Sequence, residues 1–385
     1  MAGGCGDEEA LGEAATMWGA KGNQMKWCRR FLQVRLSSLL VICTLTGGLL
    51  AWLAAERRES QRQLEIVRLL KDAQAGEVLV DFVRGGPFDK YDVYEQSWCR
   101  RMAETMLGSR VVEVTIDAPT QESLAIVGQL RDLVGLTVLD ASEPASDLTA
   151  VGRLPKLRSL SLQHDAHGLD LSPVGELSQL ETLELDVEAN VDLSPLASLT
   201  QLTTLDLILD GPNVDRQGCD ISSLASLKRL RKLSVFGPVF DLGPLAGLEE
   251  LNSLMLNYTE ADDLTPLANL HRLVGLDIGF CPVFDLSPIA ELEHLEVLEV
   301  RGTGVVDLTP VGRLARLKEL NICETAVSGL TPILQLKHLT SLHAYDTKVD
   351  ADEWKRFEMS RPSCKVDCSE PPFPTCVWGL ETQDF

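Results

Sequence analysis

Few residues of this 385-residue chain have types and spacing that could do chemistry. His164 and His167 flank Asp165 in the segment QHDAHG, which we expect to form a turn after a strand. Imidazole nitrogens and carboxylate oxygens are zinc ligands, but a zinc site needs four, and this spacing supplies no third and fourth ligand of the usual kind. We therefore predict a solvated turn here and no metal site.

Cysteines are the second candidate for chemistry, and ten are present. Cys364, Cys368 and Cys376 cluster near the C-terminus. A disulfide, a partial metal site and reduced structural thiols all stay open for this cluster, because the sequence does not identify the redox compartment. Cys281, by contrast, falls inside a repeat, where a small buried thiol is an ordinary core residue.

The usual catalytic motifs G-x-x-x-x-G-K-[ST], H-E-x-x-H and G-x-S-x-G do not occur. Acidic residues, among them Asp89 and Asp92, gather in the segment 73–110, but that segment has no histidine and no nucleophile–base pair in view. We predict that the protein is not an enzyme and that it uses no cofactor. The alternative is an enzyme or a regulatory subunit whose site lies in the non-repeat cap segments.

Any site must be positioned by a repeat that dominates the chain. Residues 263–284 read DLTPLANLHRLVGLDIGFCPVF, and residues 285–306 read DLSPIAELEHLEVLEVRGTGVV. The last four steps between equivalent starts are 22 residues each. These starts are Asp147, Asp170, Asp192, Asp220, Asp241, Asp263, Asp285, Asp307 and Gly329. A weaker copy begins near Ser123, and a strand near Val111 precedes it.

One copy shows the elements that the repeat encodes. Leu276 and Ile278 are two residues apart, so in a strand they point to one side. Leucines recur at every third residue from Leu264 to Leu270, which is the spacing of a 3₁₀ turn. Thr265, followed by proline, predicts a helix start with a hydroxyl cap. One unit cannot bury its leucines alone, so stacked units must share a core.

This pattern predicts an α/β solenoid with a parallel β-sheet on its concave face and 3₁₀ or short helical turns outside. The position after each strand carries a side chain that can satisfy backbone groups at the bend. These residues are Thr259, Cys281, Thr303, Thr325 and Thr347. Residues 110–368 thus resemble the short 22-residue class of leucine-rich repeats found in internalins and protein-phosphatase regulators.

An apolar run precedes the repeats. Residues 36–55, LSSLLVICTLTGGLLAWLAA, are uncharged, and twenty helical residues span roughly 30 Å, the thickness of a bilayer core. Five Lys or Arg residues precede the run and four follow it, which favours a cytoplasmic N-terminus. We predict a transmembrane helix and a single-pass membrane protein with its repeats on the non-cytoplasmic side. A cleaved signal peptide is the alternative.

The residues around this run carry a second resemblance. MKWCRRFLQVRLSSLLVICTLTGGLLAWLAAERRESQRQ is similar to the start of membrane-anchored leucine-rich-repeat proteins of planctomycete bacteria. Those proteins open with a basic-aromatic leader, one apolar span and an Arg-rich helix. The resemblance implies a bacterial protein and leaves two alternative starts, Met1 and Met25. With Met25 as the start, residues 1–24 are a disordered extension. The expected order begins with a partly disordered cytoplasmic leader (1–35), a transmembrane helix (36–55) and a juxtamembrane helix (56–72). An N-terminal cap (73–110), the leucine-rich repeats (111–349) and a C-terminal cap with tail (350–385) follow.

The concave face is the expected binding surface, because solenoids use long concave surfaces for recognition. Aromatic and Met side chains beside carboxylates are typical of protein-binding surfaces. The predicted partner-binding residues are Phe236, Met255, Tyr258, Asp277, Phe280, Glu299, Arg301, Glu319 and Tyr345. We expect the first three aromatics to lie close together and Tyr345 about 14 Å along the arc from Phe280, at roughly 4.8 Å per strand.

The charge balance limits the class of partner that the chain can bind. Residues 1–72 contain ten Lys or Arg and eight Asp or Glu, so the total of −22 leaves −24 for residues 73–385. Clustered Lys and Arg bind phosphate backbones, so nucleic acid is not the expected partner. We predict recognition of a protein, with a basic one compatible with this charge, or of a surface polymer. The sequence does not indicate the oligomeric state.

Overall fold

The computed structural model describes residues 48–70, 78–83, 110–117, 119–139, 147–163, 169–210 and 218–368. The chain divides into two compact units, one formed by residues 1–62 and 84–109, the other by residues 63–83 and 110–385. The described part of the first unit is helical, over residues 48–62. The second unit holds the repeats.

Among the described helices, none is long and apolar enough to cross a bilayer. Residues 36–47 of the predicted span lie outside the described residues, as does the predicted leader 1–35. The helix over residues 48–70 contains the end of the apolar run and nearly all of the predicted juxtamembrane helix. At its start, Leu49, Leu50 and Trp52 are 53%, 65% and 50% exposed.

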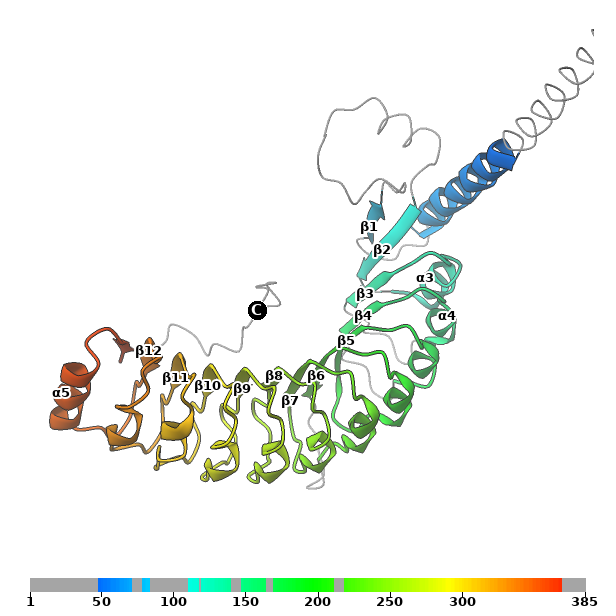
Figure 1. Cartoon of the computed structure of the whole chain (residues 1–385). Helices are drawn as coiled ribbons and strands as arrows, with labels where there is room; N and C mark the ends of the chain where they lie inside the picture. Colours follow the sequence, from blue (N-terminus) through cyan, green and yellow to red (C-terminus); the bar gives the residue numbers. More distant parts are fainter. Residues whose placement is uncertain are drawn as a thin grey trace, which may run out of the picture. The chain divides into compact units, whose positions relative to one another are not determined.

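One thirteen-stranded sheet runs through the second unit in chain order. β1 is antiparallel to β2, and every later neighbour is parallel. The strands are β1 Val78–Val83, β2 Arg110–Asp117, β3 Gly135–Leu139, β4 Ser159–Gln163, β5 Thr182–Glu188, β6 Thr204–Asp210, β7 Lys232–Phe236, β8 Ser253–Met255, β9 Gly275–Asp277, β10 Val297–Glu299, β11 Glu319–Asn321, β12 Ser341–His343 and β13 Lys365–Asp367. Within the repeats they line the inner side of an arc, which is the concave face (Figure 1).

Short helical segments lie on the outer side of the arc (Figure 1). They are α3 Gln121–Val127, α4 Thr149–Gly152, η1 Val174–Glu176, η2 Ser194–Ser198, η3 Ser222–Ser226, η4 Gly243–Leu245, η5 Thr265–Leu267, η6 Ser287–Ile289, η7 Val311–Arg313 and η8 Thr331–Ile333. The eight η segments are 3₁₀ helices, so the 3₁₀ prediction from leucines at every third residue is confirmed for them. α3 instead begins with a reciprocal cap between Thr120 and Ser123.

The rung formed by residues 263–284 shows how a repeat makes its core. All its predicted core residues, from Leu264 to Ile278, are buried. Leu276 pairs in register with Leu254 on β8 and Leu298 on β10. Because each strand contributes a leucine at the same height, the leucines of successive rungs stack into one core, as predicted.

The turn before α4 and before each of η1 to η7 carries an exposed aspartate that accepts the backbone N–H two residues later, at 2.7–2.9 Å. We call this set the turn-aspartate ladder. It comprises Asp147, Asp170, Asp192, Asp220, Asp241, Asp263, Asp285 and Asp307. The predicted hydroxyl cap at Thr265 is therefore wrong. No side-chain cap bond forms at that end of η5, and the carboxylate of Asp263 bonds the Thr265 N–H instead.

The bend after each strand is closed by the small polar side chains that the sequence predicted there. Thr303 donates its hydroxyl to the carbonyl of Val300 at 2.6 Å, and Thr325 donates to Ile322 at 2.7 Å. At the equivalent position after β9, the thiol of Cys281 donates to the carbonyl of Leu256 at 2.7 Å. The expectation that these residues satisfy backbone groups at the bend is confirmed for Cys281, Thr303, Thr325 and Thr347, whereas the hydroxyl of Thr259 pairs with the thiol of Cys281.

The described ends of the repeat stack are covered by non-repeat elements. Helix α5, Ala351–Ser360, begins with Asp350 accepting from the N–H groups of Asp352 and Glu353, and it buries Phe357 completely. β13 then pairs with β12. At the first rung, Gln63 accepts the N–H of Val111 at 2.9 Å, and Leu70 of the same helix is fully buried. The predicted cap 73–110 lies largely outside the described residues.

Candidate partner-binding surface on the concave face

In-register pairing of β8 to β12 places one inner-face side chain per strand in a continuous row, which we call the central row. Its members are Met255, Asp277, Glu299, Asn321 and His343. Neighbouring positions in such a row are about 4.8 Å apart, so adjacent side chains interact. The row thus contains Met255, Asp277 and Glu299 of the predicted site. Glu319 lies two residues earlier in β11, level with Val297.

Phe236, Tyr258 and Phe280 form a second feature, the aromatic row. The ring centroids of Phe236 and Tyr258 are 4.9 Å apart with a 48° tilt, and those of Tyr258 and Phe280 are 4.6 Å apart and stacked at 13°. The expectation that these three aromatics lie together is confirmed. Ring pairs at such distances are worth about 0.5–1.5 kcal/mol beyond the area that they bury.

The backbone under this row is unusual for aromatic residues. Tyr258 and Phe280 have φ values of 58° and 59°, and the equivalent residues Gly302, Glu324 and Asp346 have 67°, 57° and 49°. A left-handed conformation costs a non-glycine residue about 1–2 kcal/mol. The conformation recurs at 22-residue intervals, so the repeat imposes it on whichever residue stands there.

Gly302 ends the aromatic row. A Cβ at this position would lie 2.5 Å from Cδ1 of Phe280, so the ring lies over the glycine where a side chain would otherwise project. Tyr345 is not a further member, as its rung places Asp346 at the left-handed position. By 22-residue spacing, Tyr345 instead matches Arg301. The sequence-based prediction set Tyr345 apart only by its distance along the arc, whereas the structure also gives it a different position within its rung.

Arg301 covers the last ring of the row. Its Cζ lies 5.2 Å from the Phe280 centroid, a cation–π distance. Its Nε and Nη2 donate to the same carboxylate oxygen, Oε1 of Glu324, at 3.1 and 2.6 Å. Glu324 was missed by the sequence-based prediction. The 22-residue step from Tyr258 through Phe280 leads to it and is the signal that could have found it.

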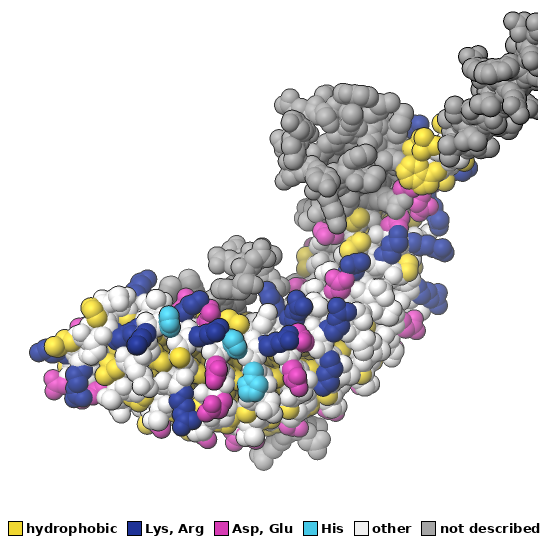
Figure 2. Space-filling model, viewed as in Figure 1, with side chains coloured by type: hydrophobic (Ala, Val, Ile, Leu, Met, Phe, Trp, Pro, Cys, Tyr) yellow, Lys and Arg dark blue, Asp and Glu magenta, His cyan; other side chains and the backbone are white. Residues whose placement is uncertain are grey.

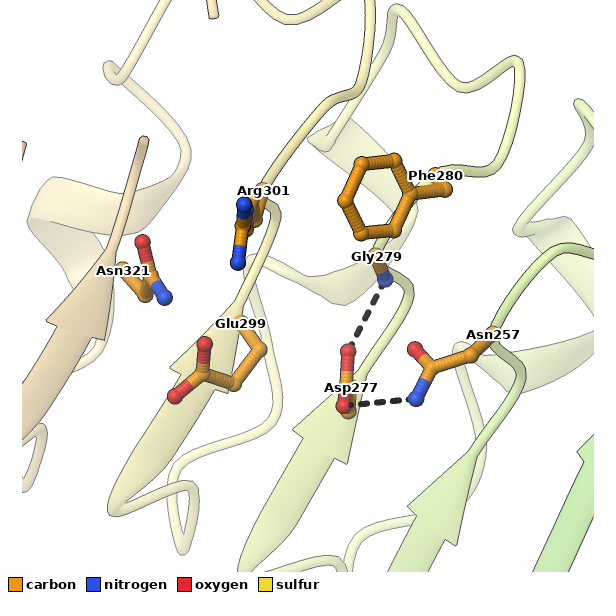
Figure 3. Close-up of a pocket in the computed structure, with 7 residues that line it drawn as sticks. All are labelled: Asn257, Asp277, Gly279, Phe280, Glu299, Arg301 and Asn321. Atoms are coloured by element: carbon orange, nitrogen blue, oxygen red, sulfur yellow. Dashed lines mark hydrogen bonds between the residues drawn. The ribbon is translucent and has the colours of Figure 1, made fainter. Parts of the chain in front are cut away.

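Asp277 and Glu299 face each other across β9 and β10. Asp277 accepts the Gly279 N–H at 2.9 Å and Nδ2 of Asn257 at 3.0 Å (Figure 3). Burial nevertheless raises its pKa, since desolvation outweighs both hydrogen bonds. Burial, followed by the charge of Asp277, raises the pKa of Glu299 to about 7.

Asn257 is a second residue that the prediction missed. It is only 7% exposed, and its Oδ1 is buried without a hydrogen-bond partner. It also lines a small hollow beside Phe280. The hollow is lined by Asn257, Asp277, Gly279, Phe280, Glu299, Arg301 and Asn321 (Figure 3). Four of these seven belong to the predicted partner-binding set.

The other chemical candidates stay apart from this surface or outside the described residues. Among the residues that the structure describes, no group of three or more His, Cys, Asp or Glu is placed to hold a metal ion. His164 and His167 lie in the undescribed segment 164–168. Cys364 and Cys368 are free thiols, and Cys376 lies beyond the described residues.

One flank of the repeats has a different character. Figure 2 shows Lys or Arg side chains mixed with Asp or Glu along it, rather than one sign of charge. Ion pairs also join successive rungs, for example Arg158 with Glu181 at 2.8 Å and Arg313 with Glu291 at 3.0 Å. Exposed pairs of this kind contribute about 0–1 kcal/mol. This flank has no continuous basic patch of the kind that binds nucleic acid.

Similarity to known proteins agrees with the architecture. No protein-family model matches the chain, and no curated protein matches it. An internalin of Listeria monocytogenes is similar over 69% of this chain and 86% of its own, with 22% identity and a TM-score of 0.55. Internalin C2 of the same organism is similar over 59% of this chain and 84% of its own, with 25% identity and a TM-score of 0.44. A leucine-rich-repeat protein of Leptospira interrogans is similar over 65% of this chain and 75% of its own, with 20% identity and a TM-score of 0.41.

The first of these similarities concerns the fold. Together with the in-order parallel sheet from β2 onward and the 3₁₀ helices behind it, it establishes that the chain has a leucine-rich-repeat fold of the α/β solenoid type.

Proposed function

We propose that this chain is a membrane-tethered, non-catalytic recognition scaffold that binds an extended segment of a protein partner through its concave face. The aromatic row is the observation that carries this proposal. Three rings from successive rungs stack on one another, and Tyr258 is still 38% exposed. Aromatic side chains of this kind dominate the energetics of protein interfaces.

The rigidity of the row supports binding. Tyr258 and Phe280 cannot rotate freely away from the surface, because each ring packs on the next and Phe280 rests on Gly302. A surface that is already ordered loses little side-chain entropy when a partner docks. A row that crosses several rungs fits a long peptide segment better than a compact metabolite, which prefers an enclosed pocket.

Charge supports a basic partner. The acidic excess of residues 73–385 attracts cationic proteins, Asp277 and Glu299 line the same hollow as Phe280, and the charge of Glu319 acts on Glu299. Complementary charge mainly accelerates association and makes it sensitive to salt. We expect the association rate to fall as ionic strength rises.

The tether is residues 36–55, and the repeats lie on the non-cytoplasmic side. Support comes from the uncharged run, from the Lys and Arg balance around it, and from the resemblance to anchored planctomycete proteins. Carbonate extraction of membranes should leave the full-length chain in the pellet. A soluble product that begins after Ala55 would replace the anchor with a cleaved signal peptide.

The concave-face proposal is tested on partners captured by the full-length chain and identified by mass spectrometry. Replacing Tyr258 and Phe280 together by Ala should weaken binding by more than about 2 kcal/mol, the scale of interface hot spots. Phe284→Ala is the matched control, since Phe284 is a 70% exposed phenyl of the same rung outside the aromatic row. If the double variant and the parent bind the partner with equal affinity, the binding site does not lie on this face.

A further inference from the structure

The hollow at the end of the aromatic row has a volume of about 20 Å³. A space of this size holds one water-sized group, because a single water needs about 10–15 Å³ on the same measure. Its acidic walls are Asp277 and Glu299, which are in-register partners on neighbouring strands. The hollow is therefore a small polar site with two carboxylates in its lining.

Neither carboxylate forms an ion pair with a cation of the described residues, although the charge of Arg301 lowers the pKa of Glu299. Arg301 also lines the hollow, but its Nε and Nη2 both bond Glu324, and its guanidinium lies over the Phe280 ring. Asp277 receives only the Gly279 N–H and the Asn257 amide, which are neutral donors. Asp277 and Glu299 are half-buried, and a partly desolvated carboxylate without an ion-pair partner is costly, so this arrangement favours the entry of a cation.

Asn257 supplies an independent indication. Its Nδ2 donates to Asp277, which leaves Oδ1 as the free end of the amide. That oxygen is buried without a hydrogen-bond partner, and it is turned towards Gly279 (Figure 3). A Cβ added to Gly279 would lie 3.2 Å from it and 3.1 Å from Oδ1 of Asp277. An unsatisfied buried acceptor is destabilising, and a donor placed beside Gly279 would relieve that cost.

We propose that this hollow binds the ε-ammonium group of a lysine side chain presented by the protein partner. The inference rests on the proposed function and names the residue that the partner must supply. An ammonium group has three donors and no acceptor. It therefore suits a site whose available atoms are the oxygens of Asp277, Glu299 and Asn257.

The size and chemistry of the hollow exclude two other cations. A guanidinium is a planar five-donor group that needs a wider, fork-shaped site. Calcium needs six to eight oxygen ligands, and the described residues contain no cluster of three or more His, Cys, Asp or Glu arranged for a metal. The site is thus selective for a compact ammonium group.

The aromatic row accounts for the rest of the lysine side chain. Phe280 forms one wall of the hollow, and Tyr258 stacks on its ring. A lysine packs its methylene stem along apolar surface while its charged end stays in a polar environment. The aromatic row would then contact the methylene stem of the lysine, and the hollow would bind its ammonium group.

Protonation of the acidic walls should compete with the ligand. Burial raises the pKa of Asp277, and it raises that of Glu299 to about 7. The charges of Asp277 and Glu319 raise the pKa of Glu299 further, whereas Asn321 and Arg301 lower it. A cation binds the ionised form, so affinity should increase as pH rises from 6 to 8.

The test uses the full-length chain labelled with ¹⁵N-glycine and titrated with Nα-acetyl-lysine methylamide. We expect saturable shifts of the Gly279 and Gly302 amide signals, which the Nε-acetylated derivative does not produce. The arginine analogue and calcium chloride should give no saturable shift at comparable concentrations. Saturation by calcium, or equal shifts with the neutral derivative, would overturn the proposal.

Gly279→Ala is the decisive variant, because its methyl group would occupy the place of the ammonium. Gly275→Ala is the matched control, since a Cβ there meets nothing within 4 Å. Gly279→Ala should lower the affinity for the lysine probe at least tenfold, as measured by the shift of the Gly302 amide signal. Gly275→Ala should leave that affinity unchanged. Glu299→Gln preserves the side-chain shape, so it should weaken the probe even if Gly279→Ala proves unstable.

The two proposals can fail separately. If the Tyr258 and Phe280 double variant loses the protein partner while Gly279→Ala and Glu299→Gln keep the lysine probe at parental affinity, the concave-face function stands and the lysine site is wrong. If Gly279→Ala weakens the probe while the double variant keeps its partner, the hollow binds ammonium and the captured partner docks elsewhere, so the assignment of the lysine to that partner is overturned.

Discussion

Two carboxylates of one rung, which belong to different sets, have opposite electrostatic behaviour. Asp263 belongs to the turn-aspartate ladder, and Asp277 to the central row of the concave face. The pKa of Asp263 is lowered by hydrogen bonds from the hydroxyl and the N–H of Thr265. The pKa of Asp277 is raised by burial, although it also accepts two hydrogen bonds.

The difference shows that access to solvent, rather than the number of hydrogen-bond partners, separates the two sets. A fully exposed carboxylate keeps its hydration, so added donors only favour its charged form. A buried carboxylate loses that hydration, which two neutral donors do not replace. The ladder therefore stabilises the fold, whereas the central row stores an unfavourable charge that a ligand can relieve.

The largest expected effect comes from the core that supports both sets. Leu276→Ala, directly before Asp277, should lower the free energy of unfolding by about 2–5 kcal/mol, as buried Leu→Ala substitutions do. Chemical denaturation at pH 7 measures this change. Glu291→Ala, which removes an exposed ion pair with Arg313, should change stability by only about 0–1 kcal/mol. Similar values for the two variants would contradict the placement of Leu276 in a shared core.

The second prediction concerns the concave face. The pKa of Glu299 is about 7 in the folded chain against an ordinary value of 4.5, so between these two pH values the folded state retains a proton that the unfolded state has lost. Stability then falls as pH rises through this window. Glu299→Gln should therefore melt at a higher temperature than the parent at pH 8 and show no such gain at pH 4. A parent–variant difference that does not change with pH would argue against desolvation of Glu299.

The smallest expected effect concerns the ladder and has the opposite sign. Asp263 has a lowered pKa in the folded chain, so its contribution is present above the unfolded value of 3.8 and is lost as pH falls through the folded value. Asp263→Ala should therefore lower the melting temperature at pH 7, and the difference should shrink towards pH 2. A variant that is as stable as the parent at pH 7 would show that the bond to Thr265 is unimportant.

Several features of the molecule could be predicted from its sequence because they repeat locally. The 22-residue period and the leucines at every third residue specify the rungs, the 3₁₀ helices and the shared core. The Thr and Cys positions at the bends follow from the same alignment of copies. The error at Thr265 arose because a threonine before a proline resembles a cap, whereas the neighbouring aspartate supplies the stronger acceptor.

The candidate site depended on how the rungs stack, which no single repeat encodes. The left-handed backbone at Tyr258 and Phe280, the space over Gly302 and the different position of Tyr345 result from the path of the chain between strands. The high pKa of Glu299 results from burial among side chains of three neighbouring strands. By itself, the sequence determined the repeat and its core, because periodic apolar burial needs only local spacing. The tertiary structure alone decided which inner-face side chains meet and lose their solvent, because those contacts join residues about 22 positions apart.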